Sequence, residues 1–267
     1  MEGLRRKESA LQEFIANCGS ALVAFSGGVD SLLLAYLAGK VLGERSLAVT
    51  AASPIRPKRN AERAKRLAQR LKIRHLVVRT EELTLPGLVR NGRDRCYHCK
   101  DHLLQKLNIL AAEHGLKYIF DGSNRDDLKE YRPGLRALRK WKVVSPFLRC
   151  GIGKEEIRLM ARRFGLPGWN RPADTCLITR VPYGVPLTRA LITRIERAED
   201  RLAELGFDGF RVRHHGQVAR IEIDPRKFSR ALRMRQEIVG GLRAAGYRFV
   251  ALDLEGYRMG CFDKKGQ

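Results

Sequence analysis

The stretch "ALVAFSGGVDSLLLAYLAGKVLG", residues 21–43, decides the fold. It joins a short apolar run to an apolar segment with helical spacing that closes at Gly43. Between them, "SGGVDS" (26–31) has two glycines, which let the backbone turn tightly and present its N–H groups openly. The amino end of the following helix favours an anion at the same point. A plain turn is the alternative, but the pattern predicts a cradle for the phosphates of a nucleotide.

The polar side chains of this loop suit the same role. Ser26 and Ser31 can donate hydrogen bonds to phosphate oxygens, and Asp30 can hold a magnesium ion that bridges them. The motif GxxxxGK[ST] is absent from the sequence, which disfavours a Walker-type kinase or GTPase.

Further strands and helices alternate after this loop. Strands are predicted over 20–26, 46–53, 75–80 and 118–123, and helices over 30–43, 57–72, 99–115 and 153–165. This order is typical of an α/β fold, a parallel sheet with helices on both faces.

The Pro- and Gly-rich stretch "LPGWNRPADTCLITRVPYGVP" (166–186) predicts a domain boundary. We place a nucleotide-binding domain, which also carries the candidate reactive cysteines, at 1–180 and a second domain, expected to bind substrate or to form oligomers, at 181–267. The pattern after the boundary is helix 188–205, strands 210–215 and 218–224, helix 226–244 and strand 248–254. It predicts a smaller, compact α+β unit.

The charge of the chain bears on its partners. It has 52 Lys and Arg against 29 Asp and Glu, a net charge of +23, and such an excess attracts polyanions, including RNA. The basic residues are dispersed and no RRM or KH motif occurs, so nucleic acid is not the favoured partner. Hydrophobic residues make up 44% of the chain, and no apolar run reaches the about 18 residues that span a bilayer. The sequence shows no signal peptide. We therefore expect a cytoplasmic protein without membrane contact.

Two sets of cysteines differ in their surroundings. Cys96 and Cys99 in "RCYHCK" form a C-x-x-C pair at the start of a helix, which suits a redox dithiol, half a zinc site or part of an iron–sulfur cluster. Cys176 lies in a loop-rich segment, where reactive side chains are common. The other three are expected to be passive small side chains: Cys18, Cys150 and Cys261.

The second domain offers a candidate anion site. Arg211 and Arg213 lie two residues apart and so share one face of a strand, and Glu222 on the next strand can lie across the hairpin from them. Arginine suits bidentate binding of a phosphate or carboxylate. The alternative is cross-strand charge pairing on a solvated sheet face.

Together these stretches resemble a known family. The strand, "SGGVDS" and helix resemble the PP-loop ATP pyrophosphatases, which share the adenine nucleotide alpha hydrolase-like fold. With "RCYHCK", "DGSNRDDLKEYRPGLRAL" (121–138), "DTCLITRVPYG" and "DLEGYRMG", nearly the whole chain resembles the LarE family of sulfur transferases of nickel-pincer cofactor synthesis. The resemblance implies that ATP is cleaved to AMP and pyrophosphate to adenylate a pyridinium biscarboxylate mononucleotide. Sulfur then replaces AMP and gives a thiocarboxylate.

The resemblance also implies residue roles and partners. ATP would be bound by the phosphate loop, through Ser26, Gly27, Gly28, Asp30 and Ser31, and Asp30 would also bind Mg²⁺. Asp30 and Cys176 would be catalytic, and a 4Fe–4S cluster would be held by Cys96, Cys99 and Cys176. The substrate would be bound by Glu199, Arg211, Arg213 and Glu222. Sulfide or another sulfur donor and a homo-oligomer are expected.

Two alternatives stay open at this point. In one branch of the family the residue matching Cys176 gives up its own sulfur and becomes dehydroalanine. A PP-loop tRNA thiolation enzyme is the second candidate, which the net charge of +23 favours. A regulatory nucleotide-binding module without catalysis would not need the three cysteines.

Overall fold

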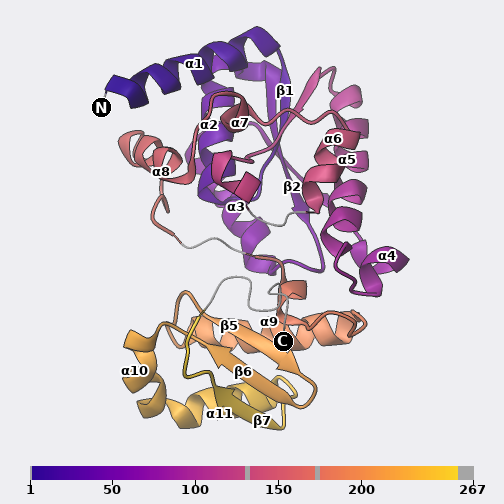
Figure 1. Ribbon diagram of the computed structural model, residues 1–267, viewed down its shortest axis with the longest axis vertical. Helices are drawn as coiled ribbons and strands as arrows, with labels where there is room; N and C mark the ends of the chain where they lie inside the picture. Colours follow the sequence, from indigo (N-terminus) through magenta and orange to yellow (C-terminus); the bar gives the residue numbers. More distant parts are fainter. Residues whose placement is uncertain (1, 130–132, 172–174, 258–267) are drawn as a thin grey trace. The chain divides into compact units, whose positions relative to one another are not determined.

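The computed structural model describes residues 2–129, 133–171 and 175–257 (Figure 1). The chain divides into two compact units. Unit 1 comprises Met1–Ser53, Lys58–Leu85 and Arg93–Asp174, and unit 2 comprises Pro54–Pro57, Pro86–Gly92 and Thr175–Gln267. The final change of unit therefore comes at Asp174, a few residues before the boundary set at 180. The functions expected for the two domains stay predictions.

Unit 1 is built on four parallel strands in the order β3-β2-β1-β4. They are β1 (Ala21–Ala24), β2 (Ser46–Ala52), β3 (His75–Arg79) and β4 (Tyr118–Phe120). Each is a little shorter than the sequence pattern suggested, because the predicted ranges included the polar residues that flank the apolar runs, such as Ser53, Thr80 and Asp121. The predicted parallel α/β sheet is confirmed.

Helices cover both faces of this sheet, as the alternation of buried side chains requires. Val23 of β1 belongs to the core under one set of helices, whereas its neighbour Leu22 belongs to the core under the other. The first set contains α1 (Glu2–Cys18), α2 (Val29–Leu42), α3 (Lys58–Arg70), α7 (Pro146–Arg149) and α8 (Lys154–Arg163). The second set contains α5 (Arg95–Glu113) and α6 (Gly134–Lys140). The expected helices on both faces are thus present.

Helix α5 begins four residues earlier than predicted, at Arg95. Its buried face consists of Leu104, Leu107 and Ala111, at the spacing of a helix that packs on a sheet. The earlier start places both Cys96 and Cys99 within the first turns of the helix.

Unit 2 combines a three-stranded sheet with helices. Its elements are α4 (Pro86–Val89), α9 (Arg189–Glu204), β5 (Arg211–His215), β6 (Val218–Glu222), α10 (Phe228–Arg233), α11 (Arg235–Ala244) and β7 (Phe249–Leu252). The strand order is β5-β6-β7, with β5 and β6 antiparallel and β7 parallel to β6. Its core joins Val212 and Ile221 of the sheet to Leu202 of α9 and Leu242 of α11.

The helix predicted over 226–244 is interrupted. Met234, with φ −96° and ψ 22°, ends α10 and precedes α11. The sequence has no Gly or Pro at this point, so the apolar pattern alone gave no sign of the break. Short 3-10 helices are η1 (Gly43–Arg45), η2 (Glu82–Thr84), η3 (Arg125–Lys129), η4 (Leu177–Arg180) and η5 (Pro225–Lys227). Among the described helices, none combines the length and apolar character of a membrane span.

Candidate active site

The phosphate loop connects β1 to α2. Gly27 adopts φ +74°, a left-handed conformation that side chains rarely allow. A Cβ atom at Gly27 would also lie 3.2 Å from the Cβ of Ala64 in α3. Both the dihedral angle and the close approach of α3 therefore require glycine at this position.

The two serines of the loop hold its shape. The Ser31 hydroxyl accepts a hydrogen bond from the Ser26 N–H at 3.1 Å, lies 3.0 Å from the Ser26 hydroxyl and donates to the Gly28 carbonyl at 3.1 Å. Gly28 is the N-cap of α2, and no side chain in the described part of the chain caps this end. The first N–H groups of a helix have no partner within it. The loop is therefore preformed, with amide donors oriented for an anion.

Asp30 in the first turn of α2 forms an ion pair that we did not predict from the sequence. The Lys154 Nζ contacts both carboxylate oxygens and lies 2.7 Å from Oδ1. Lys154 is the first residue of α8, and its backbone N–H donates to Asp126 Oδ2 at 2.8 Å. Asp126 thus acts as a cap for α8. The lysine fixes the side chain of Asp30 at the mouth of the phosphate loop.

The segment after β4 packs against this loop. A Cβ atom at Gly122 would lie 3.2 Å from the Cβ of Asp30. The neighbouring Asp121 is buried and accepts hydrogen bonds from Ser145 Oγ at 2.6 Å and Ser123 Oγ at 2.7 Å, with Lys100 Nζ 3.3 Å away. Burial alone would raise the pKa of Asp121, but the charge of Lys100 and the serine hydrogen bonds outweigh burial, and the pKa is lowered.

The candidate sulfur residues belong to different units. Cys96 is exposed and Cys99 half-buried on α5 in unit 1, whereas the half-buried Cys176 immediately precedes η4 in unit 2. Between the two cysteines of α5, His98 Nε2 lies 3.0 Å from Asp94 Oδ2 at the surface. Within residues 2–129, 133–171 and 175–257, no group of three or more His, Cys, Asp or Glu side chains is placed to hold a metal ion. The cluster stays a prediction.

The cysteines expected to be passive have the surroundings of packing residues. Cys18 and Cys150 are half-buried beside the core of unit 1. Burial raises the pKa of both thiols, which keeps them protonated near neutral pH. Cys261 lies outside the described residues.

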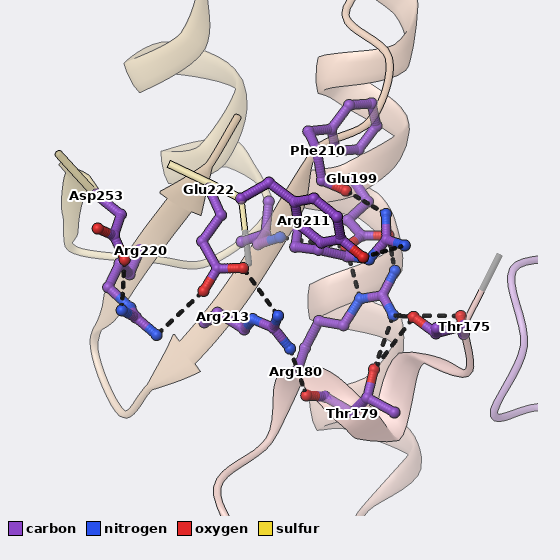
Figure 2. Close-up of polar contacts among 12 residues, drawn as sticks. Thr175, Thr179, Arg180, Glu199, Phe210, Arg211, Arg213, Arg220, Glu222 and Asp253 are labelled. Atoms are coloured by element: carbon purple, nitrogen blue, oxygen red, sulfur yellow. Dashed lines mark hydrogen bonds and ion pairs between the residues drawn. The ribbon is translucent and has the colours of Figure 1, made fainter. Parts of the chain in front are cut away.

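Five charged residues of unit 2 form what we call the arginine–glutamate cluster: Arg180, Glu199, Arg211, Arg213 and Glu222 (Figure 2). Each is at most 7% exposed. The alternative of a solvated sheet face is therefore wrong. The β5–β6 register places Arg211 opposite Glu222, the expected hairpin geometry.

Two ion pairs organise the arginine–glutamate cluster. Arg213 Nη2 donates to Glu222 Oε2 at 2.8 Å. Arg180 binds Glu199 with two parallel hydrogen bonds, Nε to Oε1 at 2.8 Å and Nη2 to Oε2 at 3.0 Å. Burial would raise the pKa of Glu199, but the guanidinium of Arg180 outweighs burial and lowers the pKa, so this carboxyl is ionised.

Arg211 completes the cluster next to an aromatic ring. Its Nη1 donates to the Phe210 carbonyl at 2.6 Å, and its guanidinium carbon lies 4.9 Å from the centre of the Tyr257 ring. Burial and the nearby charge of Arg180 lower the pKa of Arg211. An anion bound here would stabilise this buried charge.

Comparisons with known proteins identify the family. The chain is 33% identical to the pyridinium-3,5-bisthiocarboxylic acid mononucleotide synthase of Lactiplantibacillus plantarum, over 97% of this chain and 95% of that protein. It belongs to the LarE-like family of PP-loop ATP pyrophosphatases. An uncharacterized protein of Synechocystis is 39% identical over 96% of this chain and 97% of its own length.

Other similarities are to parts of this LarE-like enzyme. The family model described as NAD synthase matches residues 4–108, which contain the phosphate loop. The glutamine-hydrolyzing GMP synthase of Aeropyrum pernix is 29% identical over 67% of this chain, which corresponds to 38% of that protein. These matches agree with the parallel sheet and the glycine loop of unit 1.

Sequence reasoning missed two basic residues of the LarE-like enzyme. Lys154 is at the first position of a helix, where the helix dipole disfavours a cation, and that misfit was a signal for a carboxylate partner. Arg180 is the single charged residue in the run "CLITRVPYG". A long charged side chain amid apolar neighbours indicates a buried pair, as the structure shows.

We expect Asp121→Asn to lower the free energy of unfolding of unit 1 by roughly 1–3 kcal/mol near pH 7. Because the pKa of Asp121 is depressed in the folded state, its stabilisation is present above the unfolded pKa and is lost as pH falls through the folded pKa. The difference between variant and parent should therefore shrink in strong acid.

Urea unfolding monitored by tryptophan fluorescence measures this effect, because both tryptophans, Trp141 and Trp169, lie in unit 1. Asp224→Asn is the control, since that carboxyl is on the surface of unit 2. Equal urea midpoints for Asp121→Asn and the parent at pH 7 would contradict the prediction.

Proposed function

We propose that this LarE-like enzyme uses ATP to adenylate a carboxylate of a pyridinium biscarboxylate mononucleotide and converts it to a thiocarboxylate for the nickel-pincer cofactor. The relative from Lactiplantibacillus plantarum, whose name states a bisthiocarboxylic acid mononucleotide as its product, supports the substrate class. The observation that carries the proposal is in unit 2, where Arg180 of the buried arginine–glutamate cluster binds both Glu199 and the backbone of Cys176.

The phosphate loop supports the first half of the reaction. The amide donors at the start of α2 and the hydroxyls of Ser26 and Ser31 would hold the phosphates, and the carboxylate of Asp30, here paired with Lys154, would bind Mg²⁺. Mg²⁺ would neutralise charge on the phosphate oxygens. A carboxylate oxygen of the substrate attacks the α-phosphorus, the bond to the β-phosphate oxygen breaks, and pyrophosphate leaves.

The second half replaces AMP by sulfur. A sulfur nucleophile attacks the acyl carbon of the adenylate, and the bond to the AMP oxygen breaks. The thiols of Cys96, Cys99 and Cys176 match the donor type that iron–sulfur clusters require. A 4Fe–4S cluster on three thiolates would leave one iron able to carry a sulfide.

The other sulfur route needs Cys176 alone. Its thiolate attacks the acyl adenylate and forms a thioester as AMP leaves. Loss of the α-proton then breaks the Cβ–S bond, which releases the thiocarboxylate and leaves dehydroalanine. We favour the cluster route because all three cysteines are present.

The arginine–glutamate cluster suits one anionic group of a small ligand, because its three arginines exceed its two glutamates by one positive charge. Arg211 and Arg213 extend from one strand, and Glu222 and Glu199 neutralise part of the positive charge of the cluster. We propose that a carboxylate or the phosphate of the substrate binds to Arg211 and Arg213.

Arg211→Ala and Arg213→Ala should each weaken binding of the pyridinium mononucleotide by about one to two decades, because each removes a charge-assisted contact of roughly 1.5–3 kcal/mol. ATP binding in unit 1 should be unchanged. Calorimetric titration with each ligand measures both effects. Arg201→Ala is the control, since Arg201 is 41% exposed on α9 and pairs with Glu204.

The same titration tests the tRNA alternative, which the net charge of +23 favours. Binding of bulk tRNA by many dispersed basic residues would fall steeply with salt and would tolerate single substitutions. Tight, salt-sensitive tRNA binding, with sulfur transfer unaffected in both arginine variants, would overturn the small-molecule proposal.

A further inference from the structure

We propose that Arg180 is a positioning residue that fixes the thiol of Cys176 for sulfur chemistry. This inference rests on the proposed function, in which Cys176 holds or delivers the sulfur. Arg180 is 2% exposed and its guanidinium is divided between two tasks. Nε and Nη2 bind Glu199, while Nη1 faces the segment 175–179 that carries the cysteine (Figure 2).

The Nη1 atom makes several contacts with this segment. It donates to the Thr175 hydroxyl at 2.5 Å, the Thr179 hydroxyl at 2.9 Å and the Cys176 carbonyl at 3.0 Å. Thr175 and Thr179 are thus held together on the two sides of the cysteine. Arg180 thus links the two ends of the segment 175–179. The two hydrogen bonds to Glu199 fix the orientation of the guanidinium group.

The backbone of Cys176 is fixed as a result. Its carbonyl accepts hydrogen bonds from the Thr179 N–H at 3.0 Å, the Thr179 hydroxyl at 2.8 Å and Arg180 Nη1 at 3.0 Å. Only χ1 separates this backbone from the sulfur, so the thiol is confined to a few staggered positions. Loss of the Arg180 contact would free the segment without altering the thiol itself.

A second arginine binds the same segment. Arg213 Nη1 donates to the Thr179 carbonyl at 2.7 Å, while its Nη2 binds Glu222. Arg213 is one of the residues to which we assign substrate binding. The proposed anion site and the position of Cys176 therefore share one hydrogen-bond network, with Thr179 as the common residue.

Arg180→Lys in the full-length chain tests the role of Arg180. A lysine keeps the charge near Glu199 but cannot reproduce the planar fork that reaches Thr175, Cys176 and Thr179. In iron-free protein, alkylation of Cys176 by iodoacetamide should become roughly tenfold faster relative to Cys99 in the same sample, because local opening exposes the thiol. Hydrogen exchange of residues 175–181 should accelerate, while that of residues 211–222 should not.

The kinetic result expected is a fall in the turnover number of sulfur transfer by roughly 10²-fold, with KM for ATP unchanged, because a small misplacement of a reacting group has this order of effect. Arg201→Lys on α9 is the matched control, an arginine paired with Glu204 on the surface. It should alter neither alkylation nor turnover.

Thr179→Val provides a second variant that leaves no buried charge without a partner. It removes the hydroxyl that contacts both Arg180 and Cys176, and should raise the alkylation rate of Cys176 in the same direction. Unchanged alkylation in folded Arg180→Lys, or in Thr179→Val if the lysine variant unfolds, would overturn the proposal. Equally faster exchange throughout unit 2 would overturn it too, since that indicates a purely structural role. The alkylation and exchange measurements need neither ATP nor substrate, so they succeed or fail separately from the proposed function.

Discussion

Asp30→Ala should abolish the formation of AMP and pyrophosphate, with a fall in rate of about three orders of magnitude or more. Asp30 is the single carboxylate of the phosphate loop, at the positively polarised end of α2. In the proposed mechanism this carboxylate binds Mg²⁺, so its removal would take away that ligand at the point where charge develops on the leaving pyrophosphate. Chromatography of labelled ATP and its products measures the effect.

The fold should survive this change, because an ion pair that is partly exposed contributes little to stability. Asp101→Ala is a matched control: the Asp101 side chain is 27% exposed against 26% for Asp30, and it pairs with Lys140 at 2.8 Å. Far-ultraviolet circular dichroism follows folding in both variants; tryptophan fluorescence is unsuitable here, because Asp101 also accepts a hydrogen bond from Trp141 Nε1 at 2.7 Å. Production of ADP and phosphate by the parent enzyme would contradict the assignment of the loop.

Cys176→Ala should stop formation of the thiocarboxylate altogether, since either sulfur route requires this thiol. In the cluster route, the parent reconstituted without oxygen should contain about four irons per chain, and Cys96→Ala, Cys99→Ala and Cys176→Ala should each lose them. Cys18→Ala and Cys150→Ala should retain the iron, because burial keeps those thiols protonated. Iron analysis and the visible spectrum measure the outcome.

Mass spectrometry of the protein after turnover separates the two sulfur routes. Loss of one H₂S from Cys176, with a single turnover per chain, would replace the cluster route by the sacrificial one. Several turnovers with an intact Cys176 and iron present would support the cluster. Several turnovers in iron-free protein would contradict it.

The sequence predicted the parts of the fold that local patterns encode. Apolar runs and their spacing located the four parallel strands, and the two glycines marked the turn where Gly27 meets Ala64. The break between α10 and α11 at Met234 was not predicted, because the sequence has no turn residue there. The pairing of Asp30 with Lys154 escaped for a different reason: the two are far apart along the chain, and a single sequence holds no record of which distant charges meet.

The arginine–glutamate cluster of unit 2 illustrates the same limit of single-sequence prediction. The strand spacing predicted that Arg211 and Arg213 share one face of the strand. It does not show whether that face is buried, so the sequence could not distinguish a solvent-exposed sheet face from a buried one. The link from Arg180 to Glu199 joins a 3-10 turn to a helix and follows from packing alone.

The path of the chain between the two units limits how this architecture can evolve. The chain changes unit after Ser53, Pro57, Leu85, Gly92 and Asp174. The short excursions are bonded into unit 2: the Leu177 N–H donates to the Ile55 carbonyl at 2.8 Å, and the Leu187 N–H to the Val89 carbonyl at 2.9 Å. Because unit 2 is not one continuous stretch of the chain, a single gene fusion could neither add it nor exchange it. A recombination event that supplied a new unit 2 would have to replace three separate segments at once, so this unit is more easily altered by point substitution.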